Sequence, residues 1–185
     1  MMMRTAAGWL TPVKASGMAS YLVAAAACGF TATRSAGLRV PRLASVLCAL
    51  DLVLFVDITF DLRWRLYAFY KRGAISHRWY NERAEPQVVA LISIAVALLV
   101  TATWLCRRFA PVRGAPLAIC GALLSIGCWL TELISLHAVD AVLYRHIGPL
   151  MLVCYLWILA SAMTALGIWK AGSESLRKLY AIRLH

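Results

Sequence analysis

The sequence predicts an all-α integral membrane protein, a polytopic bundle of four to five transmembrane helices with an interfacial helical hairpin. The 185-residue chain is 62% hydrophobic and has a mean hydropathy of +0.74, whereas soluble domains hold about 45–50% apolar residues. Segment 88–106, VVALISIAVALLVTATWLC, carries no charge. Because about 20 apolar residues in a helix cross a bilayer core of about 30 Å, this segment alone indicates a membrane span. The whole chain is expected to form one transmembrane domain.

The predicted spans are charge-poor runs bounded by Arg or Pro. Pro86, Pro116 and Pro149 each stand where a helix is expected to begin, the position that tolerates proline best. The first span, 15–33, is short and rich in Ala, so a cleaved signal peptide is the alternative to a retained helix there. The five predicted spans cover residues 15–33, 43–62, 87–106, 116–136 and 147–169.

Basic residues in the loops predict the orientation. The tail after residue 169 and loop 107–113 carry several Lys and Arg, whereas loop 137–146 carries only Arg145. The positive-inside rule therefore places the C-terminus in the cytoplasm. By parity, loop 63–85 is then outside, although it holds six basic residues. Arg outnumbers Lys 15 to 4 and Ala is abundant, a composition that favours a bacterial inner membrane.

The net charge of +11 would favour nucleic-acid binding in a soluble protein. Here the basic residues stand between apolar segments, so membrane topology and contacts with lipid phosphates account for them better. Membrane lipids are therefore expected partners, and nucleic acid is not.

The cysteines lie in or beside the apolar segments, and none forms a CxxC pair. Such residues usually behave as small buried hydrophobic side chains, and no spacing here supports a metal or redox site. We expect all six to be unpaired: Cys28, Cys48, Cys106, Cys120, Cys128 and Cys154.

Acidic residues near the end of the second span begin the main candidate site. An intramembrane carboxylate is costly, so it is normally paired, protonated or functional. If the second span continues as a helix to about Arg72, then Asp57, Asp61 and Arg65 follow one stripe at i, i+4 and i+8. In that helix, Asp61 precedes Arg65 in the favourable order for an ion pair.

The fourth span becomes acidic towards the same membrane face. If its helix continues beyond Glu132, then His137, Asp140 and Tyr144 share one side. We therefore expect Asp61 to lie close to Arg65 or to the group from Glu132 to Asp140. The predicted intramembrane polar cluster comprises Asp57, Asp61, Arg65, Glu132, His137, Asp140 and Tyr144.

Three interpretations of this cluster remain open. The leading one is a buried network of ion pairs and hydrogen bonds that locks the helices together. The second is a proton or ion pathway. The third is a cofactor site, with either haem on His137 and His146 or a metal ion. No cofactor is predicted, since the usual ligand spacings are missing; a metal would use Asp57, Asp61, Glu132, His137 and Asp140.

Segment 63–85 mixes aromatic and basic side chains directly after the second span. This composition suits the membrane interface, where rings lie at headgroup level and guanidinium groups contact phosphates. We expect helix to about Arg72 and a break at Gly73. The segment is either a simple anchor or a surface for lipid, quinone or a partner protein. Its expected contact residues are Arg63, Trp64, Tyr67, Tyr70, Arg72, Trp79 and Arg83.

The chain contains no P-loop, no GxSxG and no HExxH motif. The leading function is therefore a small non-catalytic integral membrane subunit that binds a partner protein, a second copy or lipid within a membrane complex. One alternative is a small ion, proton or metabolite transporter that uses the acidic cluster. Another is a membrane enzyme or redox subunit. Helix packing is expected to use the small residues Gly121, Ser125, Ser161 and Ala165.

Overall fold

The fold comes from a computed structural model that describes residues 10–35, 39–76 and 83–183, with side chains as far as Arg177. Helices account for nearly all of these residues, and a single two-stranded hairpin precedes the last helix. In chain order the elements are α1 (Pro12–Arg34), α2 (Arg39–Phe60), α3 (Leu62–Ser76), α4 (Ala84–Phe109), α5 (Ala115–Ile134), α6 (His137–Leu143), β1 (His146–Ile147), β2 (Leu150–Met151) and α7 (Leu152–Arg183).

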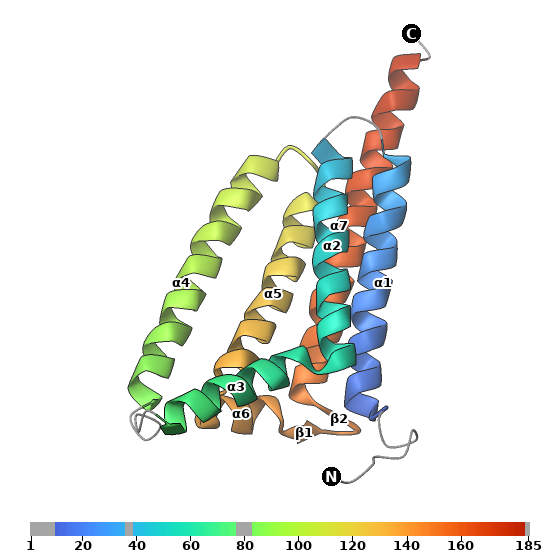
Figure 1. Cartoon of the computed structure of the whole chain (residues 1–185). Coiled ribbons are helices and arrows are strands. Elements are labelled where there is room, and N and C mark those ends of the chain that lie inside the picture. Colours follow the sequence, from blue (N-terminus) through green and yellow to red (C-terminus); the bar gives the residue numbers. More distant parts are fainter. Residues whose placement is uncertain (1–9, 36–38, 77–82, 184–185) are drawn as a thin grey trace.

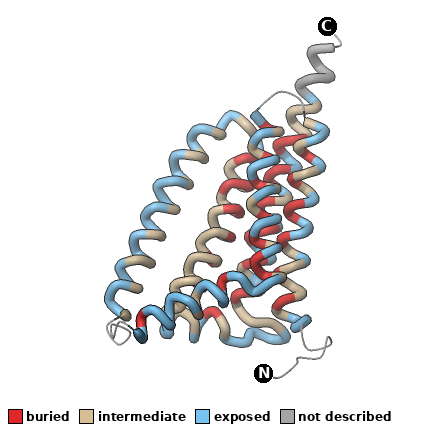
Figure 2. The backbone as a smooth tube through the Cα atoms, viewed as in Figure 1, coloured by how far each residue is buried: buried red, intermediate tan, exposed pale blue. Residues whose placement is uncertain are grey.

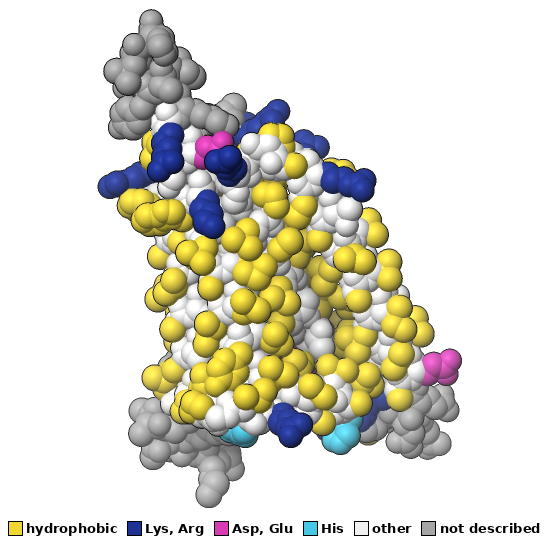
Figure 3. All heavy atoms as spheres, turned by 180° about the vertical axis from the view of Figure 1, so that it is seen from behind, with side chains coloured by type: hydrophobic (Ala, Val, Ile, Leu, Met, Phe, Trp, Pro, Cys, Tyr) yellow, Lys and Arg dark blue, Asp and Glu magenta, His cyan; other side chains and the backbone are white. Residues whose placement is uncertain are grey.

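Five helices, α1, α2, α4, α5 and α7, are long and apolar enough to cross a membrane. The predicted all-α transmembrane bundle is thus confirmed. Figure 1 shows these helices side by side, with α3, α6 and the β1–β2 hairpin gathered at one end, which we call the capped end. Loop 107–113 and the last turns of α7 lie at the opposite end. Lys and Arg gather at that opposite end in Figure 3, and we call it the arginine-rich end.

The second span ends earlier than predicted. Helix α2 stops at Phe60, and Asp61 takes a left-handed conformation with φ +56°. Aspartate is one of the few residues that adopt this conformation readily. The chain then turns into α3, which lies across the capped end (Figure 1). Gly73 does not break this helix, because α3 continues to Ser76.

The fourth span also ends early, and the fifth starts late. Helix α5 stops at Ile134, because Ser135 is left-handed with φ +52°, so α6 is a separate short helix. Helix α7 begins only at Leu152. Gly148, with φ +64°, and Pro149 form the turn between β1 and β2, so Pro149 does not start a helix.

Helices α5 and α7 approach each other closely. A Cβ atom added at Gly121 would lie 2.5 Å from the carbonyl oxygen of Ala160. Gly167 similarly lies directly against the backbone of Ala118. Of the small residues expected to mediate packing, Gly121 lies at this contact, and Ser125 and Ser161 are buried. Such close backbone approach suits association in lipid, where apolar side chains gain no hydrophobic driving force.

Helix α4 differs from the other spans. None of its residues is buried, and it packs against α5. Figure 2 shows it as the one long helix without buried positions, standing apart from α1, α2 and α7. All six cysteines are free thiols, as expected, although the sulfur atoms of Cys106 in α4 and Cys120 in α5 lie 3.8 Å apart.

Candidate functional site

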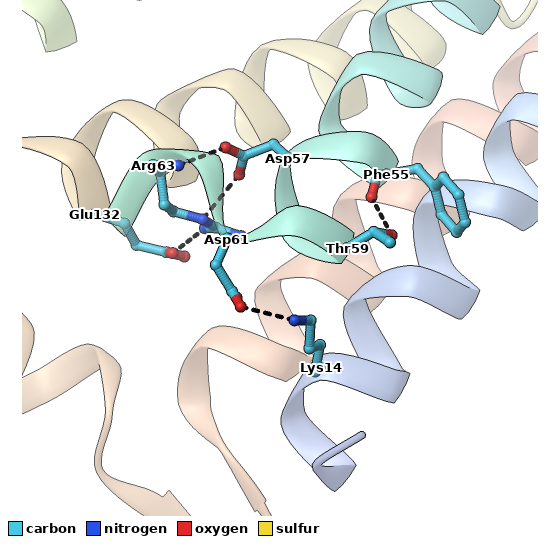
Figure 4. Close-up of polar contacts among 7 residues, drawn as sticks. All are labelled: Lys14, Phe55, Asp57, Thr59, Asp61, Arg63 and Glu132. Carbon is cyan, nitrogen blue, oxygen red and sulfur yellow. Dashed lines mark hydrogen bonds and ion pairs between the residues drawn. The ribbon is translucent and has the colours of Figure 1, made fainter. Parts of the chain in front are cut away.

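The site is built around Arg63, in the first turn of α3. Because the chain turns sharply at Asp61 into α3, the Arg63 side chain points back between α2 and α5 (Figure 4). Its Nε lies 2.9 Å from Oδ2 of Asp57, and its backbone N–H donates to Oδ1 of Asp57 at 2.8 Å. Its Nη1 donates to Oε2 of Glu132. One guanidinium thus joins the end of α2 to the end of α5.

All three charged groups of this cluster are buried, with Arg63 only 4% exposed. A guanidinium stays charged in proteins and its fork of donors fits carboxylates. Removing one partner of a buried pair leaves an uncompensated charge, so the cluster depends on all its members. The guanidinium carbon also lies 5.3 Å from the ring centre of Trp157, which brings α7 into the same cluster.

A second ion pair ties α1 to the turn between α2 and α3. Lys14 lies in the first turn of α1, which Thr11 caps by accepting the Lys14 backbone N–H at 3.2 Å. The Lys14 ammonium lies 2.8 Å from Oδ2 of Asp61. The Lys14 side chain is buried, whereas the Asp61 side chain is 51% exposed, so this pair forms the outer edge of the site.

The Arg63–Glu132 and Lys14–Asp61 ion pairs border a cavity of about 390 Å³ at the capped end. Its lining residues carry three buried polar atoms, Oε1 of Glu132, the hydroxyl of Tyr144 and Nε1 of Trp157, and the Tyr144 hydroxyl has no hydrogen-bond partner among the described residues. Burial raises the pKa of the Tyr144 hydroxyl, which therefore remains a donor at neutral pH. A buried water needs two to four polar partners, and these atoms supply them.

The structure brings together four of the seven residues predicted for the polar cluster: Asp57, Asp61, Glu132 and Tyr144. The predicted stripe through Arg65 does not form, because α2 stops before Asp61. Arg65 is exposed and bonds to Asp61 only through its backbone N–H.

The two remaining predicted residues lie beside the site. Asp140 accepts a hydrogen bond from the Ser135 hydroxyl at 2.7 Å and so holds the turn between α5 and α6. His137 is exposed at the start of α6. Neither residue lines the cavity.

Three residues of the site were not expected there. Arg63 was assigned to the membrane interface, although its position six residues after Asp57 and two after Asp61 is a local signal for pairing. Lys14 precedes the predicted first span, and no sequence pattern connects it with Asp61. Trp157 lies within the fifth span, where nothing distinguishes it from an ordinary core residue.

Helix α3 carries most of the residues predicted to contact the interface. Trp64 lies with its ring centre 6.2 Å from that of Tyr144 and 6.3 Å from that of Tyr67. Tyr70 and Arg72 are exposed on α3, and Arg83 is half-buried just before α4. Trp79 lies outside the described residues.

The acidic residues do not form a metal-binding group. Within the described part of the chain, no three His, Cys, Asp or Glu side chains lie close enough to hold one ion. Arg63 instead stands between Asp57 and Glu132. The two histidines considered for haem, His137 and His146, are both exposed.

Asp51 lies deeper in the bundle than the cavity. It is fully buried in α2, and neither of its carboxylate oxygens has a hydrogen-bond partner in the part of the chain that the structure describes. An unpaired carboxylate in such a place is normally protonated or functional.

No protein-family model, curated protein or solved structure matches this chain.

Proposed function

We propose that this chain is a small non-catalytic subunit of a membrane complex, in a bacterial inner membrane with its C-terminus in the cytoplasm. The proposal rests on the exposure of helix α4. All 26 of its residues are outside the core, whereas the other four spans each contain buried residues. Among the described elements α4 packs mainly against α5, so a transmembrane helix of a partner protein would give it a second close neighbour.

The side of α4 away from α5 is the proposed contact. Val96 and Leu105 are nine residues apart, which is half a turn out of phase at 3.6 residues per turn. Leu105 is half-buried, and Val96 is 57% exposed. Val96 therefore marks the outer side of α4, together with its exposed neighbours Val89 and Val100.

The buried charges support a non-catalytic role. Arg63, Asp57 and Glu132 contact one another, and Lys14 contacts Asp61. These groups hold α1, α2, α3 and α5 together at the capped end, and this use of their charges is structural. The cavity beside them is partly open and has polar atoms in its lining, so waters can fill it.

Site-specific photo-crosslinking in the native membrane tests the proposal. A photoreactive residue at Val96 is expected to give one discrete protein adduct whose partner is identified by mass. The matched control is Val23 of α1, which is 62% exposed to the same apolar surroundings and should give none. Differently tagged copies distinguish a second copy from another protein. Lipid adducts alone at both positions would overturn the proposal.

One observation favours a second function, proton or ion transport. Asp51 is a fully buried carboxylate without a hydrogen-bond partner among the described residues. Proton flux into proteoliposomes tests this function, with Asp51→Asn expected to abolish the flux and Asp61→Asn, at the half-exposed edge, expected to retain it. Wild-type protein without flux would remove the transport alternative.

A further inference from the structure

A crevice of about 560 Å³ lies between α2, α4 and α5 near the arginine-rich end. It exists because α4 stands away from α2, so that α5 forms the floor between them (Figure 1). Leu43, Leu47 and Leu50 of α2 form one wall, and Leu105 and Phe109 of α4 form the other. The floor holds Ala122, whose small side chain leaves the space open. The volume lies within the range of about 300–1,000 Å³ that is typical of ligand pockets.

The mouth of this apolar crevice is strongly basic. Arg39 and Arg42 line it from the first turn of α2, and Arg108 lines it from the last turn of α4. All three side chains are exposed, and none forms an ion pair with a carboxylate of the described residues. Arg108 only packs over Trp104, with its guanidinium carbon 5.5 Å from the ring centre. The positive charge at the mouth is therefore uncompensated within the described chain.

We infer that this crevice binds one anionic glycerophospholipid. The phosphate contacts the guanidinium groups of Arg39, Arg42 and Arg108, and an acyl chain lies along the apolar walls. Guanidinium groups bind phosphate through paired charge-assisted hydrogen bonds. Basic pockets between transmembrane helices on the cytoplasmic side suit anionic headgroups, and the predicted orientation places this end in the cytoplasm.

A lipid fits this site better than a helix of another protein. The three cations lie at one end of the spans, at the depth where lipid phosphates are abundant, while the space below them is apolar. A partner helix would have to bring carboxylates to the same depth. The inference does not depend on a protein partner at Val96, since that residue is on the side of α4 away from the crevice.

Native mass spectrometry of protein from vesicles of phosphatidylcholine with a minor share of phosphatidylglycerol tests the inference. The wild type is expected to retain one phosphatidylglycerol in preference to phosphatidylcholine. Replacing Arg39, Arg42 and Arg108 together by Gln should lower this retention at least tenfold. The matched control replaces Arg107 and Arg113, which are exposed at the same end but do not line the crevice.

A crevice-filling variant separates the acyl contact from simple charge attraction. Val46 is 66% exposed and lines the crevice, so Val46→Trp fills the space without disturbing the core. It should displace the lipid although every arginine remains. Equal loss from the control arginine variant, or full retention by Val46→Trp, would overturn the inference. Equal retention of phosphatidylcholine would overturn it as well.

Discussion

Arg63 is the residue on which the capped end depends. Its guanidinium contacts Asp57 and Glu132, and all three groups are buried. The acidic members were predicted from the sequence, because carboxylates inside apolar spans stand out. The basic residue predicted to pair in this stripe was Arg65, with Asp61, because helical spacing assumes an unbroken helix, and hydropathy contains no signal for the left-handed turn at Asp61.

Arg63→Gln is expected to destabilise the protein strongly, since it leaves two buried carboxylates without a counter-charge. Breaking a buried ion pair typically costs about 3–5 kcal/mol. Arg65→Gln, two residues away and exposed, is expected to change the free energy of unfolding by less than about 0.5 kcal/mol. Thermal unfolding in detergent measures both variants. A wild-type melting temperature for Arg63→Gln would contradict the structural role of the cluster.

The Tyr144→Phe variant tests whether the cavity at the capped end holds a water or another polar ligand. The Tyr144 hydroxyl is buried without a hydrogen-bond partner among the described residues. If the cavity is dry, removing the hydroxyl should leave stability unchanged or raise it, because an unsatisfied buried polar group costs about 1–3 kcal/mol. A loss of more than about 1 kcal/mol in the same unfolding assay would instead indicate that a water or small polar ligand bonds to the hydroxyl.

At the scale of elements, hydropathy predicted four to five spans, and the structure has five helices long and apolar enough to be spans, but hydropathy did not predict how they end. The ends of α2 and α5 depend on single left-handed residues, Asp61 and Ser135. The start of α7 depends on a short hairpin around Gly148 and Pro149. These features follow from local backbone geometry and tertiary contacts, such as the Asp57 carboxylate accepting the Arg63 N–H, which no apolar periodicity reveals.

The contact between α5 and α7 gives a paired prediction. Gly121→Ala would place a Cβ atom 2.5 Å from the Ala160 carbonyl oxygen and 2.6 Å from the Thr164 backbone nitrogen. Forcing an extra methyl into packed helices typically costs about 1–3 kcal/mol. Gly73→Ala in α3 meets no atom within 4 Å, and should stabilise that helix by up to about 1 kcal/mol. Melting temperatures that move in the same direction would contradict this packing.

At the scale of the whole molecule, charge is distributed unequally between the two ends. The arginine-rich end exposes Arg39, Arg42, Arg107, Arg108 and Arg113. At the capped end, two basic side chains are neutralised, because Arg63 and Lys14 pair with acidic residues. Arg63 is the member of segment 63–85 that this pairing neutralises, whereas Arg65 and Arg72 of the same segment are exposed. A count of Lys and Arg in the sequence does not distinguish arginines that form ion pairs from those that do not.

Labelling of single introduced cysteines with a membrane-impermeant maleimide tests the orientation. Arg145→Cys, at the capped end, should react in intact cells, and Arg113→Cys should react only after permeabilisation. Both residues are exposed, so accessibility does not limit the reaction. The wild-type protein measures background labelling of the native thiols, which lie in the spans. The reverse pattern would place the arginine-rich end outside.

The position of Arg63 in the chain also bears on the order of assembly. Its first partner, Asp57, is six residues away, whereas its second partner, Glu132, is 69 residues away. Chains fold from the N-terminus as they are synthesised. Asp57 and Arg63 can therefore neutralise each other while α2 enters the bilayer, long before α5 exists. Once α5 is inserted, Glu132 binds a guanidinium that Asp57 already orients. This later contact joins the second half of the bundle to the first.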